Sequence, residues 1–518
     1  MQQAVERTDI VEQPKILSER TRKVLDLSMK LSSIPSVSVP PSLTNFEAIN
    51  EAHNTAKEFA ISAGLNVMEM RADEEHPYPY LVIGFNEPTN GEGAAGDKVA
   101  LVGHLDVVSA QTDSQFSPRI DGDMLIGRGT ADMKTVVATQ LVWMAEQQKK
   151  EGPKPPIVLM LSSCEENGSV KPYGTQHAIQ MLQSEHNIKI ELAIVGERTG
   201  EMESINQLSV GPICDRNRGW RWYRGSGMGV KGLQGLKLIA EMVKGGRTWV
   251  NVMNTEEGWN TGFVNSFAGI EADEESVSTD DTEISIISRK GEAKHAASIS
   301  AEMPTLLEDF YEIAKLAQQI FGEENVKLTG IEIGDDGNFN TVTGGGKMAL
   351  EIKGLGSGLK DFLEKISSYD YSSIDIHKKL SSQNGHRSSR MEKYHGTIFG
   401  LDIREIPAQT SDVNAWLENT RQRLQSAGIE METVNEGDGW VCPPNNNHLE
   451  KLISAYEEVT SRSHKQVGKL HGNDGRFFEG NAVVFGQIGQ NPHGPNEAHY
   501  IPSIETYMQV LDAFASKY

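Results

Sequence analysis

The sequence predicts an α/β protein, with a mostly parallel-sheet domain into which an α+β domain is inserted. Up to about residue 205, short apolar runs alternate with amphipathic stretches, as strands and helices do in an α/β layer. From 206 to 436 the order is that of an α+β protein, and the alternating pattern then returns. The chain has 518 residues, too many for one compact core, so at least two domains are expected.

The elements of the first domain follow from the spacing of apolar residues. Residues 16–35 have helical periodicity, and 46–63 predicts a second helix that ends at Gly64. The elements expected next are a strand at Tyr80–Phe85, a strand at Val99–Val102, a helix at Met133–Gln148, a strand at Ile157–Ser162, a helix at Gly174–Leu182 and a strand at Ile190–Val195.

The inserted region has a different order of elements. It begins with a basic aromatic segment, Arg216–Arg224, which a Gly- and acid-rich region near 224–281 follows. The segment 354–396, rich in Gly, Ser and Lys, is expected to be an added loop or subdomain. The predicted domains are 1–205 plus 437–518, and the insertion 206–436. The elements expected from the insertion to the end of the chain are strands at Ile284–Ile287, Met348–Ile352, Thr397–Asp402 and Ala482–Phe485, and helices at Met303–Ile320, Val413–Ala427 and His448–Ser461.

Composition excludes some partners. The formal net charge of −23 repels nucleic acids and anionic membranes. No apolar run reaches the ~18–20 residues that span a bilayer, and Met1–Arg22 does not read as a secretory signal. The three cysteines are widely spaced and form no Cys-x-x-Cys pair, which predicts reduced thiols and a cytoplasmic location.

Polar residues follow several of the predicted strands at their carboxyl ends, where ligand sites lie in open α/β sheets. His104 and Asp106 come just after the strand that includes Val102. The histidine is a candidate metal ligand, and Asp106 would hold its far ring nitrogen and fix the tautomer. A partly exposed histidine without a metal is the alternative.

Carboxylates follow further along the chain. Asp132, in the segment 127–134 (GRGTADMK), precedes a predicted helix and is either an N-cap or a ligand whose two oxygens bridge two cations. Glu165 and Glu166 follow the apolar strand 157–161. Two adjacent carboxylates repel each other at a buried strand end unless a cation or a proton joins them. A solvated surface pair is the alternative.

Two more candidates complete the set. Glu197 follows the strand at 190–195, and His493 lies in the C-terminal segment 492–497 (PHGPNE), with His499 as a competitor for the same role. Histidines and carboxylates together form a mixed nitrogen and oxygen donor set that suits zinc, with cobalt or manganese as alternatives. Two such cations, bridged by Asp132 and water, would generate hydroxide near neutral pH.

These five motifs, in this order, resemble the co-catalytic zinc amidohydrolase and peptidase family. Its members include succinyl-diaminopimelate desuccinylase, acetylornithine deacetylase, carboxypeptidase G, aminoacylase and the carnosinase-like dipeptidases. The resemblance implies that His104 and Glu197 bind one metal, and that Glu166 and His493 bind the other. Asp132 would bridge them, Asp106 would orient His104, and Glu165 would be the general base. The Asn-Glu after His493 favours it over His499.

The resemblance also implies that the insertion is a lid over the active site. The segment around His295 is similar to the lid segment whose histidine stabilises an oxyanion. Asn340, Arg404 and Arg476 match lid and loop motifs that would bind substrate, and the two guanidinium groups would grip a carboxylate. An exposed histidine and structural salt bridges are the alternatives. Asn340 and Arg404 are further apart than in the simple family pattern.

The function expected from this resemblance is metal-dependent hydrolysis of an amide bond in a small carboxylate-bearing substrate. An N-acyl amino acid deacylase or desuccinylase is favoured by the loop 474–477 (DGRF), and a carnosinase-like dipeptidase by the enlarged lid. A catalytically silent protein that binds a small ligand is the alternative from another class. A dimer through the lid, or a monomer whose lid covers its own site, both fit the resemblance.

Overall fold

The computed structural model describes most of the predicted α/β domain and parts of the insertion. The described residues are 17–39, 43–71, 78–86, 96–167, 174–198, 217–226, 249–253, 282–289, 291, 293–295, 303–333, 341–343, 345–369, 371, 373–378, 396–405, 419, 422–423, 425–426, 429–433, 440, 442–464 and 472–518.

A six-stranded mixed sheet forms the centre of the α/β part. Its strand order is β2-β3-β8-β4-β9-β20, and the C-terminal β20 lies at one edge. The contacts β8–β4, β4–β9 and β9–β20 are parallel, whereas β2–β3 and β3–β8 are antiparallel. The prediction of an α/β protein with a parallel-rich sheet is confirmed. The strands are β2 (Asn66–Met70), β3 (Tyr80–Gly84), β4 (Gly96–His104), β8 (Ile157–Ser162), β9 (Ile188–Val195) and β20 (Ala482–Val484).

Helices cover this sheet, so its central strands are apolar throughout. Every residue of β8 is buried, as expected for a strand covered on both faces. Nearly all of α3 is buried as well, including Trp143, because α3 packs between the sheet and the helices α1 and α12. The helices are α1 (Glu19–Ser32), α2 (Phe46–Ser62), α3 (Thr135–Lys149), α4 (Gly174–His186), α11 (Asn447–Thr460) and α12 (Pro502–Ala515).

The start of α3 lies close to the carboxyl end of β4. A Cβ atom added to Gly103 would lie 2.8 Å from a methyl carbon of Val137, so only glycine permits this approach. The turn 130–134 leads into α3 and therefore lies beside the end of β4. That turn carries Asp132.

A small antiparallel sheet joins two distant parts of the chain. Its strand order is β21-β22-β7-β6, and β22 pairs with β7. This pairing brings the loop 491–497 next to the segment 127–134. Neither this sheet nor α12 follows from the sequence patterns above. The strands are β6 (Arg119–Asp121), β7 (Met124–Ile126), β21 (Gly489–Gln490) and β22 (Ala498–Tyr500).

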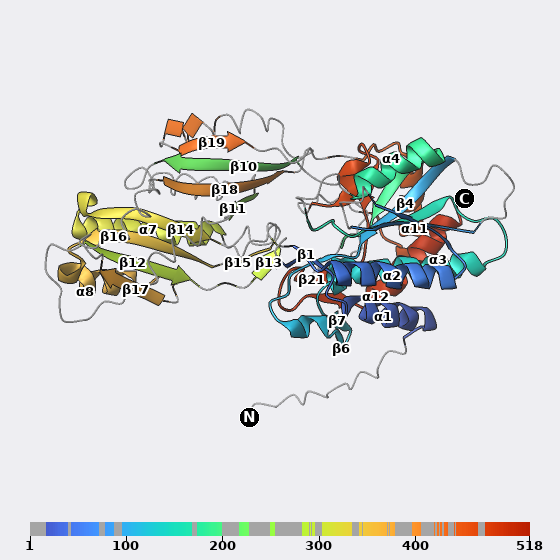
Figure 1. Ribbon diagram of the computed structural model, residues 1–518, viewed down its shortest axis with the longest axis horizontal. Coiled ribbons are helices and arrows are strands. Elements are labelled where there is room, and N and C mark those ends of the chain that lie inside the picture. The colour runs from blue at the N-terminus through green and yellow to red at the C-terminus, as the bar shows by residue number, and fades with distance from the viewer. Residues whose placement is uncertain are drawn as a thin grey trace, which may run out of the picture.

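The insertion holds two four-stranded antiparallel sheets, of order β11-β18-β10-β19 and β14-β16-β12-β17. Figure 1 shows these strands grouped apart from the six-stranded sheet, with the short pair β13–β15 between the two groups. The elements are β10 (Asn217–Ser226), β11 (Trp249–Met253), β12 (Thr282–Arg289), β13 (Ala293–His295), α7 (Met303–Phe321), β14 (Val326–Ile333), β15 (Thr341–Thr343), β16 (Gly346–Lys353), α8 (Leu355–Ile366), β17 (Ser373–Lys378), β18 (Gly396–Glu405) and β19 (Ile429–Thr433).

Some predictions fall outside the described residues. The predicted domain boundaries at 205–206 and 436–437 lie outside the described residues. The division into 1–205 plus 437–518 and 206–436 therefore stays a prediction. Most of the helix predicted at Val413–Ala427 also lies outside the described residues. Among the described residues, no helix combines the length and the apolar character needed to cross a bilayer.

Candidate metal centre

Three neighbouring strands deliver candidate ligands to one edge of the sheet. His104 is the last residue of β4, Glu165 and Glu166 follow β8, and Glu197 follows β9. The register aligns His104 with Ser162, so these parallel strands end side by side. Their carboxyl ends place the side chains around one space, as the sequence predicts.

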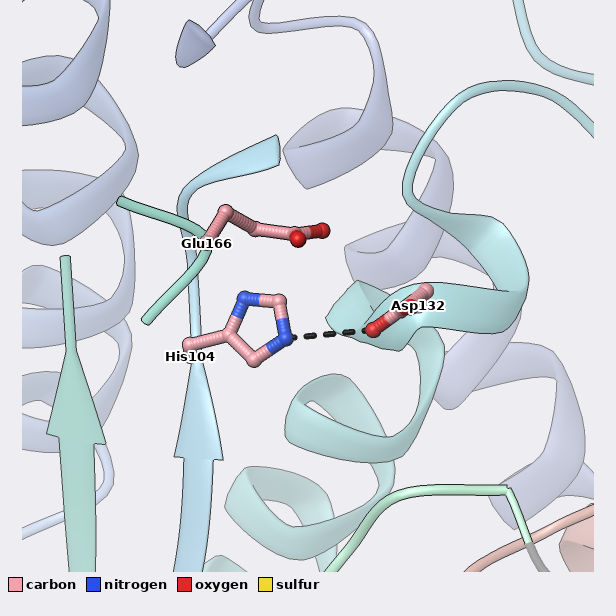
Figure 2. Close-up of side chains that lie close together, drawn as sticks. All are labelled: His104, Asp132 and Glu166. Carbon is pink, nitrogen blue, oxygen red and sulfur yellow. Dashed lines mark hydrogen bonds and ion pairs between the residues drawn. The ribbon is translucent and has the colours of Figure 1, made fainter. Parts of the chain in front are cut away.

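The first half of the cluster forms around His104. Its Nε2 lies 3.1 Å from Oδ1 of Asp132 and 3.5 Å from Oε1 of Glu197. Figure 2 shows the His104 ring pointing at Asp132, with the carboxylate of Glu166 extending toward the same space. Ligand atoms of His104, Asp132 and Glu166 all lie within 4.8 Å of one another.

The second half of the cluster forms around His493, which lies in the loop 491–497 near the C-terminus. The Nε2 of His493 lies 3.1 Å from Oε1 of Glu166 and 3.4 Å from Oδ2 of Asp132. Asp132 therefore presents Oδ1 to His104 and Oδ2 to His493. This is the arrangement that a carboxylate between two cations requires, and His104, Asp132, Glu166, Glu197 and His493 are thus brought together.

Glu165 lies in the same cluster. One of its oxygens lies within 4.8 Å of ligand atoms of both His104 and Glu197. Burial raises its pKa well above the usual value, and the charges of Asp474, Glu166 and Glu197 add to that effect. A carboxyl group with a raised pKa and a place beside the candidate ligands has the properties of a general base.

Burial and the charges of neighbouring groups set the pKa values of the other residues in the cluster. Burial alone would lower the pKa of His493, but Glu166 and Asp132 outweigh it and raise it to about 10. Burial would raise the pKa of Asp132, but His104 and His493 hold it well below its usual range. Burial and the charge of Asp132 raise the pKa of Glu197 to about 7.

Acidic and basic groups thus lie at close range in a buried site. Clustered carboxylates are costly in a buried site unless cations or protons compensate them. The donor set of imidazole nitrogens and carboxylate oxygens fits divalent cations such as zinc, manganese or cobalt.

Asp106 connects His104 to the neighbouring strand end. Its Oδ1 lies 3.4 Å from Nδ1 of His104, and its backbone oxygen lies 3.0 Å from the same nitrogen. The side-chain oxygens accept hydrogen bonds from the backbone N–H groups of Glu165 (3.2 Å) and Glu166 (3.1 Å), and from the hydroxyl of Ser38 (2.6 Å). Asp106 is thus placed to orient the histidine and the glutamate pair together.

Three of the alternatives considered from sequence are wrong. His104 is only 1% exposed, so it is not a partly exposed histidine. Glu165 and Glu166 are buried and do not form a solvated surface pair. Asp132 is not the N-cap of α3, because Lys134 occupies that position and the Asp132 carboxylate faces the two histidines.

His499 lies on β22, opposite Gly489, and no described contact joins it to the clustered carboxylates. Burial lowers its pKa to about 3, so it remains neutral. It is a buried histidine of the small sheet. The contacts of His493 with Asp132 and Glu166 favour His493 for the ligand role, as the sequence motif does.

The candidates for substrate binding are only partly described. His295 ends β13, opposite Thr341, and Arg404 lies on β18, opposite Arg218 and Trp249, but both side chains lie outside the described part of the structure. Asn340 is also outside it.

Arg476 lies in the turn 474–477 and is half-buried. Its guanidinium carbon is 4.7 Å from the centre of the Phe477 ring. Its charge lowers the pKa of the buried Asp474, although burial raises that pKa overall. Thr175 donates a short hydrogen bond to Asp474.

Sequence reasoning assigned no role to several buried charged residues around the cluster. Lys134 donates from Nζ to the backbone oxygens of Leu31 (2.9 Å) and Ile34 (2.8 Å), which fastens the end of α1 to the turn that carries Asp132. Burial lowers the pKa of Lys134 to about 7. Arg128 and Glu497 form a second such connection. All three lie within the motifs 127–134 and 492–497, but no pattern in the sequence reveals which groups they contact.

The fold and the cluster define the class of the protein: a metal-dependent hydrolase. The model of peptidase family M20/M25/M40 matches residues 100–517. The chain therefore belongs to this family, and the expected resemblance is confirmed.

Curated relatives match over part of their length. The chain is 28% identical over 170 residues to a succinyl-diaminopimelate desuccinylase from Rickettsia massiliae, a match that covers 32% of this chain and 42% of that protein. It is 37% identical over 114 residues to the enzyme of the same name from Nitrosomonas eutropha, covering 21% and 29%. The matches thus span less than half of these relatives.

Solved structures match over nearly the whole chain. Human carnosine dipeptidase 1 is 14% identical, with a TM-score of 0.51 over 96% of this chain and 95% of that one. The di-peptidase Dug1p from Saccharomyces cerevisiae is also 14% identical, with a TM-score of 0.51 over 96% and 97%. At this identity they establish a shared fold.

Proposed function

We propose that this protein hydrolyses an amide bond in a small carboxylate-bearing substrate, using two divalent cations, with zinc as the favoured metal. The observation that carries the proposal is the position of Asp132, which presents one oxygen to the half of the cluster around His104 and the other to the half around His493. His104 and Glu197 would hold one cation, and Glu166 and His493 the other. Cobalt and manganese suit the same donors.

Bound there, such cations would polarise the scissile carbonyl and lower the pKa of a water molecule. Glu165 would accept the proton of that water and deliver it to the departing nitrogen. Asp106 would hold His104 in the tautomer that leaves Nε2 free to bind. His295, from the predicted lid, would donate to the developing oxyanion. Arg404, Arg476 and Asn340 remain candidates for binding the substrate.

The substrate proposed first is an N-acyl amino acid or a related amide. The support is the identity with desuccinylases over the matched segments and the half-buried Arg476, a group suited to a carboxylate. A dipeptide is the second candidate, because the dipeptidases among the solved structures share the fold over nearly the whole chain. A panel of N-succinyl amino acids, N-acetyl amino acids and dipeptides separates the two.

The first measurement is metal content and turnover on that panel. We expect two equivalents of metal per chain, and hydrolysis that a chelator abolishes and added zinc restores. Two equivalents of metal with no turnover on any amide would favour a catalytically silent protein that binds a small ligand. No bound metal would contradict the proposal as a whole.

We also propose a cytoplasmic location for this protein. Cys164 and Cys442 are both free, which suits a reducing compartment. The predicted lid would either form a homodimer or cover the site of its own chain. Light scattering at several protein concentrations distinguishes the two states.

A further inference from the structure

Two segments that carry candidate ligands meet through one buried ion pair. Arg128 and Glu497 are each 1% exposed, and Nη1 of Arg128 donates to Oε2 of Glu497. The other oxygen, Oε1, accepts hydrogen bonds from the backbone N–H groups of Ala131 (2.9 Å) and Asp132 (3.0 Å). One carboxylate thus fixes the backbone at the residue that lies between the two histidines.

The same pair fixes the backbone at His493. Arg128 donates from Nη2 to the backbone oxygen of His493 at 3.1 Å. Nε2 of Gln111 donates to that oxygen as well, at 3.0 Å. The backbone N–H of Gly127 donates to the backbone oxygen of Glu497 at 3.0 Å, which ties the two segments together once more.

The contacts of Glu497 argue against a ligand role for it. Both of its oxygens are engaged, one by two N–H groups and the other by a guanidinium. The described contacts of its carboxylate are thus to the backbone and guanidinium that surround the ligands.

Stability alone is a poor explanation for this pair. Removing two charges from water costs several kcal/mol per ion, and well-packed apolar residues often stabilise as well or better. The pair does provide a fixed geometry, because a carboxylate with three donors and a guanidinium with several acceptors permit few arrangements. That geometry links Asp132 to His493.

We propose that Arg128 and Glu497 are positioning residues that set the spacing between Asp132 and His493, and so adjust both cation sites. The inference rests on the proposed metal centre. The Arg128–Glu497 ion pair would determine the affinity of the two cation sites and the geometry of their ligands. Groups that orient ligands typically affect metal affinity by ~10–100-fold.

The test is a titration of metal-free protein with Co²⁺, followed by visible absorption, which reports both affinity and ligand geometry. We expect Glu497→Gln to weaken Co²⁺ binding at least ~10-fold and to change the absorption spectrum. Arg128→Lys keeps the positive charge but lacks the forked donors, so it should have a smaller effect of the same kind. If Glu497→Gln does not fold, the Arg128→Lys variant alone tests whether the ion pair affects Co²⁺ binding.

The matched control is another ion pair that joins distant segments. Arg20 contacts Asp512 at 3.0 Å and Glu146 at 2.8 Å, and no described contact links it to the cluster. Arg20→Met should lower the melting temperature of the metal-free protein and leave Co²⁺ affinity and spectrum unchanged.

The possible outcomes distinguish a failure of the positioning role of Arg128 and Glu497 from a failure of the proposed metal centre. If Glu497→Gln and Arg128→Lys lower the melting temperature as Arg20→Met does, but bind Co²⁺ like the wild type, the pair is structural and the inference is wrong. If the wild-type protein itself binds no Co²⁺, the proposed metal centre fails, and this inference fails with it.

Discussion

The Nε2 of His493 lies 3.1 Å from Oε1 of Glu166, although 327 positions separate the two residues in the sequence. The contact joins a loop near the C-terminus to the end of the buried strand β8. The same nitrogen lies 3.4 Å from Oδ2 of Asp132, so the contact adds His493 to the candidate metal centre.

Glu165→Gln should abolish most turnover and leave metal content unchanged. Glutamine keeps the size of the side chain but cannot accept the proton of water, and general base catalysis typically contributes ~10²–10⁴-fold. Turnover is measured on the hydrolysed substrate, and metal content by elemental mass spectrometry. Because an oxygen of Glu165 also lies within 4.8 Å of ligand atoms of His104 and Glu197, loss of one metal equivalent would instead assign it as a ligand.

His493→Ala should reduce the metal bound from two equivalents to one, and His499→Gln should retain two. The first change removes a nitrogen that contacts both Asp132 and Glu166. The second changes a buried histidine on β22 that has no described contact with the cluster. Metal content of both variants is measured after dialysis. The reverse pattern would assign the ligand role to His499.

Gly486→Ala should displace Glu197 and weaken metal binding. A Cβ at this position would lie 2.2 Å from the backbone oxygen of Glu197 and 2.4 Å from that of Gly196, so one segment must move. Crowding of this kind typically destabilises by ~1–3 kcal/mol.

Gly84→Ala is the matched control, because a Cβ there meets no atom within 4 Å. Urea unfolding and metal titration of both variants are the measurements. Equal metal affinity in the two variants would show that the approach of Gly486 does not position Glu197.

Stability should fall as the pH decreases from about 6.5 to about 4, in part through His53. Burial lowers the pKa of His53 from 6.5 to about 4, against a weaker opposing effect of the Ser162 carbonyl. The folded state therefore keeps His53 neutral, while the unfolded state binds a proton in this range. Its contribution is complete above pH 6.5 and is lost as the pH falls towards the folded pKa.

The check is urea unfolding of wild type and His53→Gln at pH 7 and pH 4.5. The loss of unfolding free energy between these pH values should be smaller in the variant by roughly 2 kcal/mol, at ~1.4 kcal/mol per pKa unit. A loss of the same size in both proteins would mean that His53 titrates normally in the folded state.

Much of the fold followed from local sequence patterns. The predicted strand at Ile157–Ser162 and the predicted helix near 46–63 match β8 and α2 closely, because the apolar pattern lies within each element and does not depend on distant contacts. The small sheet β21-β22-β7-β6 was missed. Its strands are two or three residues long, too short for a periodic pattern.

The candidate site was predictable as a set of residue types but not as a geometry. Polar residues after apolar strands identified His104, Glu166 and Glu197, because parallel strands present their carboxyl ends at one edge. The sequence left open whether Asp132 was an N-cap, and the position of Lys134 as the cap of α3 excluded that.

The sequence alone determined which side chains the strand ends carry, and hence a nitrogen and oxygen donor set suited to divalent cations. Only the tertiary structure decided how these donors meet. Asp132 lies between His104 and His493 because β22 pairs with β7 and Glu497 binds the backbone of Asp132 from 365 positions away. Contacts over such distances leave no local periodicity or spacing in the sequence, since they depend on the packing of the whole sheet.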